Sequence, residues 1–243
     1  MGLIGETFDW FTTAANWSGD DGVPTRLREH VAMSATATFA AALIAQPVGI
    51  GLGHLRRFGP LAINVANVGR ALPSFAILVL GVQVFGLRDI PLLALSLTTF
   101  IALVALAIPP MVTNSYVAVS EVGPDIRDSA RGMGMSGRQL LRRVELPLAV
   151  PLIMAGVRTS AVQVVATATI AAFVGWGGLG RFVVDGIAVR NFAEVLAGSI
   201  LVATLALMTE AALAVSQRLL TPRPLRGGRE TPSGAGAQKG VAA

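Results

Sequence analysis

Five long stretches almost free of charge limit most strongly what this chain can fold into. A helix needs about 20 apolar residues to cross the hydrocarbon core of a bilayer. The stretches are 31–53, 71–87, 90–120, 146–180 with the single charge Arg158, and 195–217 with the single charge Glu210. One such run also fits a buried helix of a soluble protein, but five in 243 residues argue against that. We expect an all-α, polytopic membrane protein with about five transmembrane helices, the third ending near Pro109 and Pro110.

Composition excludes several classes of function. Only 14% of the residues are charged, against about 25% in soluble domains. The chain has no cysteine and two histidines, His30 and His54, so we expect no disulfide, no metal site and no cysteine nucleophile. Without a cluster of catalytic side chains, a membrane enzyme is disfavoured. The net charge is +5, and the basic residues lie between the apolar runs. This placement indicates that they orient the helices in the membrane and do not bind nucleic acid.

The basic residues predict the orientation of the helices. Five helices place the two termini on opposite sides of the membrane. One side receives twelve Lys and Arg residues, in 56–57, 127–143 and 218–239, and the other receives five: Arg26, Arg28, Arg88, Arg181 and Arg190. Cytoplasmic loops carry the excess of positive charge. We therefore expect the N-terminus outside, the C-terminus in the cytoplasm, and the loop 121–147 on the cytoplasmic side of a bacterial plasma membrane.

Three regions follow from this topology. Residues 1–25 lack the pattern of a signal peptide and are expected to form an extracytoplasmic leader, either a short helix on the membrane surface or a frayed segment. Residues 26–220 form the transmembrane domain. Residues 221–243, rich in Pro, Gly and Arg, are expected to be a disordered cytoplasmic tail.

The loop between the third and fourth predicted helices is unlike the rest of the chain. Its core, "DSARGMGMSGRQLLRRVELP" (128–147), combines four arginines with three glycines. Gly134 and Gly137 should break a helix that begins at Asp128. Leu140, Leu141 and Val144 then form an apolar stripe. We expect two short helices joined at a bend, the second amphipathic, with small residues and exposed methionines suited to docking on another protein.

This loop resembles the signature of permease subunits of ATP-binding-cassette importers. That pattern is Glu-Ala-Ala, three residues, Gly, nine residues, and Ile-x-Leu-Pro. The matching residues here are Asp128, Ser129, Ala130, Gly134, Val144, Leu146 and Pro147. The spacing fits throughout, whereas Asp128, Ser129 and Val144 depart conservatively from the family's residues. The resemblance implies a type I importer permease fold, with the loop as the coupling helix that rests on a separate ATPase.

Other segments narrow the resemblance to one branch. "VRTSAVQVVATATIAAFVGWGGLGRFVVDG" (157–186), "NVGRALPSFAIL" (67–78) and "QPVGIGL" (46–52) resemble permeases that import osmoprotectants such as glycine betaine, choline, carnitine or proline. The resemblance implies three protein partners besides membrane lipid: two ATPase subunits, a second permease and an extracytoplasmic substrate-binding protein. ATP would be bound by the partner, and this chain would hold no cofactor. Permeases for methionine, phosphonate or alkylsulfonate share the loop pattern and stay open as alternatives.

Polar residues on the predicted helices are candidates for lining the transport path. They are Asn67, Ser74, Thr113, Asn114, Gln163, Thr167 and Thr169. Each could instead bond to its own helix or fasten two helices together. Arg70, Arg158 and Glu210 within the apolar runs suggest snorkelling or an ion pair. The glycine-rich "GWGGLG" (175–180) lacks the lysine of a phosphate-binding loop, so we read it as a tight turn between helices. A secondary transporter, the main rival, would leave the loop 121–147 unexplained.

Overall fold

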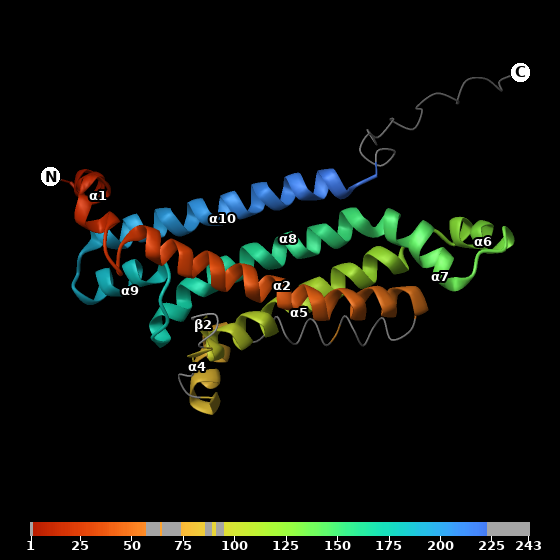
Figure 1. The fold of residues 1–243 in the computed structure, drawn as a ribbon, viewed down its shortest axis with the longest axis horizontal. Coiled ribbons are helices and arrows are strands. Elements are labelled where there is room, and N and C mark those ends of the chain that lie inside the picture. The colour runs from red at the N-terminus through yellow and green to blue at the C-terminus, as the bar shows by residue number, and fades with distance from the viewer. Residues whose placement is uncertain (1, 57–63, 65–73, 86–88, 91–94, 223–243) are drawn as a thin grey trace, which may run out of the picture.

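The computed structural model describes residues 2–56, 64, 74–85, 89–90 and 95–222, and within them the chain is almost entirely helical (Figure 1). Four helical stretches are long and apolar enough to cross a membrane. They are α2 (Val23–Leu55), α5 (Leu97–Ser120), α10 (Phe192–Leu220), and a continuous stretch from Gly137 to Val174 that contains α8 (Leu146–Ile170). These four coincide with four of the five predicted spans. The polytopic all-α membrane architecture is therefore confirmed.

The second predicted span coincides with α4 (Ser74–Phe85), a shorter apolar helix. At 1.5 Å per residue its 12 residues extend about 18 Å, less than the bilayer core of about 30 Å. A two-residue antiparallel pair, β1 (Asp89–Ile90) with β2 (Leu95–Ser96), precedes α5. The predicted path residue Asn67, Arg70 and the predicted disordered tail, apart from Thr221 and Pro222, lie outside the described residues.

A stripe of mostly small side chains joins α2 to α5. On α2, every fourth residue from 33 to 53 is buried: Met33, Ala37, Ala41, Ala45, Gly49 and Gly53. At Gly49 a Cβ atom would lie 2.7 Å from the Val112 carbonyl oxygen and from the Ser115 Cβ of α5. Without a driving force from water, membrane helices associate through such close packing of small residues. Ser115 Oγ adds a hydrogen bond across the seam to Gln46 Oε1 at 2.5 Å.

The structure contradicts the prediction that the third helix ends near Pro109 and Pro110. Helix α5 passes through both prolines and continues to Ser120. A proline in a helix interior removes a backbone hydrogen bond, but neighbouring helices can compensate within a membrane. Here α2 and α8 pack along α5 on both sides of the prolines, and Ser160 Oγ of α8 donates to the Ala107 carbonyl oxygen at 3.2 Å, which ties α8 to this part of α5. The carbonyl oxygens that lose their partner to the prolines are those of Ala105 and Leu106. Tertiary packing thus outweighs the helix-breaking tendency of the sequence.

The charges predicted within the membrane pair with each other. Arg158 Nε of α8 lies 3.0 Å from Glu210 Oε1 of α10. Gln217 extends this contact, because its Oε1 accepts from Arg158 Nη1 at 3.1 Å while its Nε2 donates to the Pro151 carbonyl oxygen at 2.8 Å. The ion pair proposed as one reading of these residues is therefore present, and it holds α8 to α10.

The bundle has two distinct ends (Figure 1). At one end, called the loop end below, α6 (Pro124–Gly132) and α7 (Gly137–Leu140) connect α5 to α8. The opposite end carries α1 (Leu3–Thr12), a 3₁₀ turn (Ala14–Trp17) and α9 (Gly180–Ala188). A second 3₁₀ turn (Ala171–Val174) joins α8 to the glycine-rich segment before α9. Trp10 of α1 packs edge-on against Phe182 of α9, with ring centroids 5.3 Å apart.

Candidate functional site

The bend predicted at Gly134 is a complete helix-ending motif. Gly134 N donates to the Arg131 carbonyl oxygen at 2.8 Å, and Met135 N reaches back to the Ala130 carbonyl oxygen at 3.2 Å. These two bonds make a Schellman motif, which requires a left-handed residue at the position of Gly134. Its φ is +81°. The next helix, α7, starts with a capping box between Ser136 and Gln139. The predicted pair of short helices joined at a bend at Gly134 is confirmed, but the first helix begins at Pro124, four residues before Asp128, and Gly137 starts the second helix instead of breaking one.

The loop presents one face to its surroundings and buries the other. Of the predicted coupling residues, Asp128, Ser129 and Gly134 are exposed, and Met133 between them is 72% exposed. Ala130 is buried, and so is Leu140 in the predicted apolar stripe. Val144, Leu146 and Pro147 are half-buried where the loop joins α8. The exposed face combines small residues with the charges of Asp128 and Arg131, and no residue described by the structure covers it.

Glu145 connects the loop to α2, a contact that sequence reasoning missed. Its side chain is 0% exposed. One carboxylate oxygen, Oε2, lies 2.5 Å from His54 Nδ1 at the end of α2, so this ring nitrogen carries the proton. The other, Oε1, lies 3.0 Å from Arg127 Nη1 of α6. We call these three residues, His54, Arg127 and Glu145, the loop clamp.

Two further contacts strengthen the attachment of the loop to α2. Arg127 Nη2 donates to the His54 carbonyl oxygen at 3.2 Å, and Arg56 Nη2 donates to the Val122 carbonyl oxygen at 2.8 Å. Burial lowers the pKa of the Arg127 guanidinium, because lost hydration opposes its charge more than the Glu145 carboxylate supports it. The buried cation therefore depends on Glu145 as its partner.

The passage from the loop into the membrane stretch is continuous. Residues Leu141–Glu145 form one π-helical turn, in which Leu146 N donates to the Leu141 carbonyl oxygen five residues earlier. The wider turn lies directly before Pro147, which has no N–H to donate in an α-helical pattern. The second predicted short helix is thus the first turn of a stretch that runs from Gly137 to Val174. The part of the loop from Gly137 onward and α8 therefore form one helical stretch, and α6 is a separate helix before the bend.

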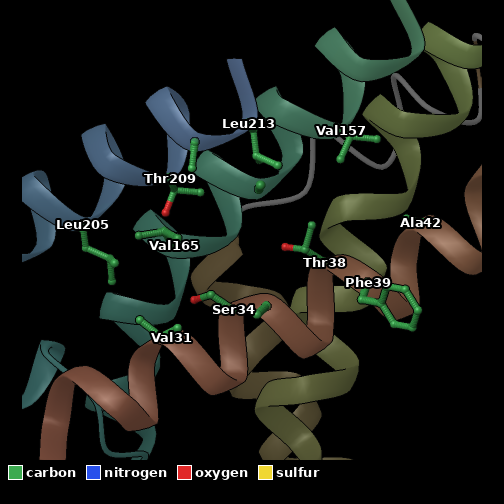
Figure 2. Close-up of a pocket in the computed structure, with 13 residues that line it drawn as sticks. Val31, Ser34, Thr38, Phe39, Ala42, Val157, Val165, Leu205, Thr209 and Leu213 are labelled. Carbon is green, nitrogen blue, oxygen red and sulfur yellow. The ribbon is translucent and has the colours of Figure 1, made fainter. Parts of the chain in front are cut away.

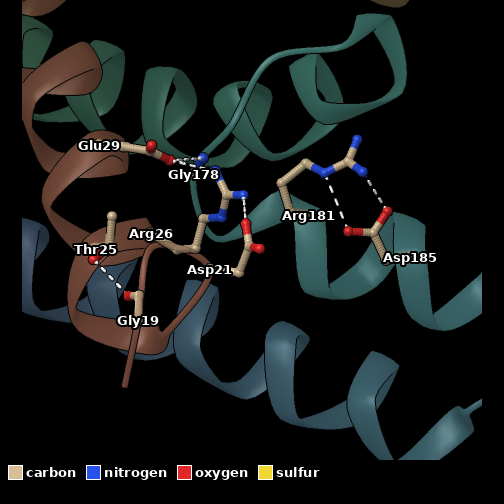
Figure 3. A network of polar contacts seen from close by, with 8 residues as sticks. All are labelled: Gly19, Asp21, Thr25, Arg26, Glu29, Gly178, Arg181 and Asp185. Carbon is tan, nitrogen blue, oxygen red and sulfur yellow. Dashed lines mark hydrogen bonds and ion pairs between the residues drawn. The ribbon is translucent and has the colours of Figure 1, made fainter. Parts of the chain in front are cut away.

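At the opposite end, side chains of α2 bind backbone N–H groups of the glycine-rich turn 175–179, as Figure 3 shows for Glu29 and Gly178. Gly178 N donates to Glu29 Oε2 at 2.8 Å, and Leu179 N donates to His30 Nδ1 at 3.2 Å. The other ring nitrogen, His30 Nε2, donates to the Val165 carbonyl oxygen of α8 at 3.0 Å. We call Glu29, His30 and the backbone of 178–179 the turn clamp. The reading of 175–180 as a turn between helices is confirmed.

Charged residues surround the turn clamp in Figure 3. Arg26 Nη1 lies 2.9 Å from Glu29 Oε2, and the other arm of Arg26 pairs with the exposed Asp21. Arg181 and Asp185 pair along one face of α9. These charges, without Glu29, line a cavity of about 310 Å³ together with Trp10 and Phe182. This end of the bundle therefore offers a polar surface.

The predicted path residues fall into two groups. Thr113 Oγ1 and Asn114 Nδ2 donate to carbonyl oxygens one turn earlier on α5, at 3.0 and 2.8 Å, and Thr169 Oγ1 does the same on α8 at 3.5 Å. These three bond to their own helices. Gln163 is half-buried and Thr167 buried on α8, while Ser74 is the half-buried first residue of α4. Among the described residues, none of these six lines the cavity of about 310 Å³ or the larger cavity between α2, α8 and α10.

A cavity of about 410 Å³ lies instead between α2, α8 and α10, as Figure 2 shows. Its walls are aliphatic except for Phe39 and three hydroxyl residues, Ser34, Thr38 and Thr209. Ser34 Oγ is buried and has no hydrogen-bond partner among the described residues. No charged side chain lines this cavity. Within the described residues, no group of three or more His, Cys, Asp or Glu could bind a metal.

Comparison with known proteins gives the chain a family. Residues 27–226 match the family described as "Binding-protein-dependent transport system inner membrane component". The chain is 33% identical over 202 residues to the glycine betaine/carnitine/choline transport system permease protein OpuCB of Bacillus subtilis (strain 168), covering 83% of this chain and 90% of the relative. It is 36% identical over 202 residues to the carnitine transport permease protein OpuCB of Listeria monocytogenes, covering 83% and 89%.

Solved structures agree on the fold. A chain of the inward-facing MetNI methionine ABC transporter superposes with a TM-score of 0.70 at 22% identity, covering 82% of this chain and 96% of that one. An amino acid ABC transporter with histidines gives a TM-score of 0.62 at 20% identity, covering 88% and 98%. The chain belongs to the family of binding-protein-dependent transport system inner membrane components, multi-pass permeases of the plasma membrane with the type I importer fold.

Proposed function

We propose that this permease carries small osmoprotectants of the glycine betaine, choline and carnitine class into the cell. This cargo is proposed because the chain is 31–36% identical, over most of its length, to permeases named for these compounds. The chain has few aromatic residues with which to cage a quaternary ammonium ion. Trp176 is buried against His30, with ring centroids 5.9 Å apart. Selection of the cargo therefore belongs to a separate binding protein.

We further propose that the loop end docks on an ATPase subunit, which binds the ATP. Asp128, Ser129, Met133 and Gly134 form the exposed face, and the Schellman motif fixes its shape. This chain needs no cofactor of its own. A second permease subunit and an extracytoplasmic substrate-binding protein complete the importer. The rocking of helices between inward-open and outward-open states is then driven through the loop.

The proposed orientation places the loop end in the cytoplasm. The support is the excess of arginines at that end, including the exposed Arg131, Arg138, Arg142 and Arg143. The opposite end, with the turn clamp and its surrounding charges, then faces outward, where the binding protein delivers cargo. The N-terminal helix α1 lies on this outer side. Its exposed Ile4 and Phe8 suit contact with the membrane surface.

Two residues on α8 are the preferred candidates for the transport path. Gln163 and Thr167 are four residues apart, so they share one face of the helix. The side chains of Thr113, Asn114 and Thr169 are engaged with their own helices. Ser74 and Asn67 stay as proposals for the same role. Substitution of any of these residues should alter the rate of transport and leave the affinity of the binding protein for its cargo unchanged.

Transport by the reconstituted complex tests the function. The permease is purified with its cognate ATPase and binding protein and placed in vesicles loaded with ATP. Uptake of labelled choline, glycine betaine, carnitine and proline is measured against methionine, an alkylsulfonate and a phosphonate. We expect uptake of at least one quaternary ammonium compound that depends on both ATP and the binding protein. Uptake of methionine, alkylsulfonate or phosphonate alone would show that the proposed cargo is wrong. Uptake without the ATPase would overturn the importer mechanism.

A further inference from the structure

One carboxylate in the loop end has surroundings that the docking role of the loop does not explain. Glu145 is fully buried and makes no contact with the exposed docking face. Its two oxygens point to different elements, Oε2 to His54 of α2 and Oε1 to Arg127 of α6. Glu145 itself lies in the π-helical turn that continues into α8. The Glu145 carboxylate therefore connects α2, α6 and the π-helical turn that leads into α8.

Stability alone is a weak reason for this arrangement. A buried ion pair can often be replaced by apolar residues of similar volume without loss of stability, because burying two charges costs about as much as their attraction returns. What apolar packing does not reproduce is the directional bond to His54. The small-residue stripe of α2 packs on α5, whereas His54 reaches the π-helical turn directly through its side chain. The bond thus ties the loop to α2 at a defined point.

The consequences for movement follow from the helical connections. The second half of the loop, from Gly137, forms one continuous helical stretch with α8 up to Val174, so displacement of α7 moves α8 directly. Helix α2 is separated from this stretch by the whole of α4 and α5 in the chain. Its inner end is attached to the loop through His54, Arg56 and Arg127. The His54 side chain makes the direct bond from α2 to the start of the α8 stretch, and Arg127 bridges the His54 carbonyl oxygen to Glu145 beside it.

We infer that Glu145 is a positioning residue for transport: through its bond to His54 it makes the coupling loop and the inner end of α2 move as one body when the ATPase closes. This inference rests on the proposed importer function. Without the bond the loop would still dock and α8 would still move, and the inner end of α2 would follow them only through its packing on α5 and α8 and through the bonds of Arg56 and Arg127. ATP would then be hydrolysed without the matching transport of cargo.

Two double variants separate this role from stability. Both remove the buried charges together, so neither leaves an unpaired ion. Glu145→Gln with Arg127→Met keeps an amide oxygen that can accept from His54 Nδ1, whereas Glu145→Leu with Arg127→Met removes it. The complete complex, with ATPase and binding protein in vesicles, is used for each. The measurement is cargo transported per ATP hydrolysed, alongside the yield of assembled complex.

The expected result is a difference between the two variants. The glutamine variant should keep most of the wild-type ratio, and the leucine variant should lose about tenfold, a typical size for coupling between two sites. Equal ratios in the two variants would overturn the inference. Absence of uptake by the wild-type complex would instead count against the proposed function, so the two failures are distinguishable.

A distance measurement in the otherwise wild-type chain covers the case in which the variants fail to assemble. The chain has no cysteine, so spin labels can be attached at Leu55→Cys on α2 and Ile126→Cys on α6. Both positions are exposed. In complexes with labels in one permease chain, the distance should stay the same in the nucleotide-free and ATP-bound states. A change of this distance between the states would overturn the inference without any transport assay.

Discussion

The two ends of α2 are held to the rest of the bundle by different chemistry. At the loop end, His54 meets a buried carboxylate that also pairs with the buried Arg127. At the opposite end, Glu29 and His30 accept hydrogen bonds from the backbone of the turn 175–179. The loop clamp joins side chains, whereas the turn clamp joins side chains to main chain.

This difference indicates how each end responds to damage. Removing one partner of a buried ion pair leaves an uncompensated charge and costs about 3–5 kcal/mol. A buried backbone group that loses its hydrogen bond costs about 1–3 kcal/mol. An exposed ion pair contributes about 0–1 kcal/mol. The loop clamp should therefore be the more brittle of the two, and the charges around the turn clamp should be the more tolerant.

The largest expected difference between the two ends comes from removing one cation at each of them. Arg127→Met leaves Glu145 buried with only His54 as partner, and we expect a loss of about 3–5 kcal/mol in the free energy of unfolding. Arg26→Met removes contacts to the exposed Asp21 and to the partly buried Glu29, which stay in reach of water, and should cost about 1 kcal/mol or less. Thermal unfolding of the purified protein in detergent measures both. Equal losses would contradict the contrast between the two ends.

A smaller effect should come from two glycines that share a backbone conformation but differ in their surroundings. Gly134 has φ +81° and open space around it, whereas Gly178 has φ +77° and a Cβ there would lie 2.8 Å from the Trp176 ring. Gly134→Ala should cost only backbone strain, about 1–2 kcal/mol. Gly178→Ala should add a packing penalty of about 1–3 kcal/mol. Unfolding temperatures of the two variants provide the comparison.

Gly132 supplies the control for this pair. It lies in the same loop with open space around it, and its backbone φ is not in the left-handed region. Gly132→Ala should therefore be neutral or stabilising, since alanine favours helix. If Gly132→Ala and Gly134→Ala destabilise equally, strain at the bend is not the reason for a glycine at 134. Uptake should also fall for Gly134→Ala and not for Gly132→Ala.

Local patterns in the sequence predicted the parts of the structure that depend on neighbours in the chain. Apolar runs predicted the four spanning stretches, and the glycine after a short helix predicted the bend at Gly134. Local rules failed at Pro109 and Pro110, because contacts with α2 and α8 maintain α5 through them. A proline penalty is a property of an isolated helix, and packing from two sides exceeds it.

The clamps could not be predicted because they join residues far apart in the chain. His54 and Glu145 are separated by 91 positions, and Glu29 and Gly178 by 149. The position of Glu145, an acidic residue directly before an apolar run, could have marked it as a candidate for a buried contact. It does not identify the partner. The ion pair of Arg158 with Glu210 was one of several readings for the same reason. Pairing over such distances requires the arrangement of helices.

The smallest effect on stability, and the sharpest test of the docking face, is expected at Asp128. Its carboxylate lies on the exposed face and reaches Arg131 only at 3.7 Å, in a pair that is open to solvent. Asp128→Ala should change the free energy of unfolding by less than about 0.5 kcal/mol. Because the same side chain belongs to the proposed ATPase contact, the variant should still weaken assembly with the ATPase, measured by co-purification. Asp128→Glu, which keeps the charge and introduces the residue typical of the family, should assemble at least as well as the natural chain. Normal assembly of the alanine variant would remove Asp128 from the docking face, while a large loss of stability would show that the carboxylate has a structural role like that of Glu145.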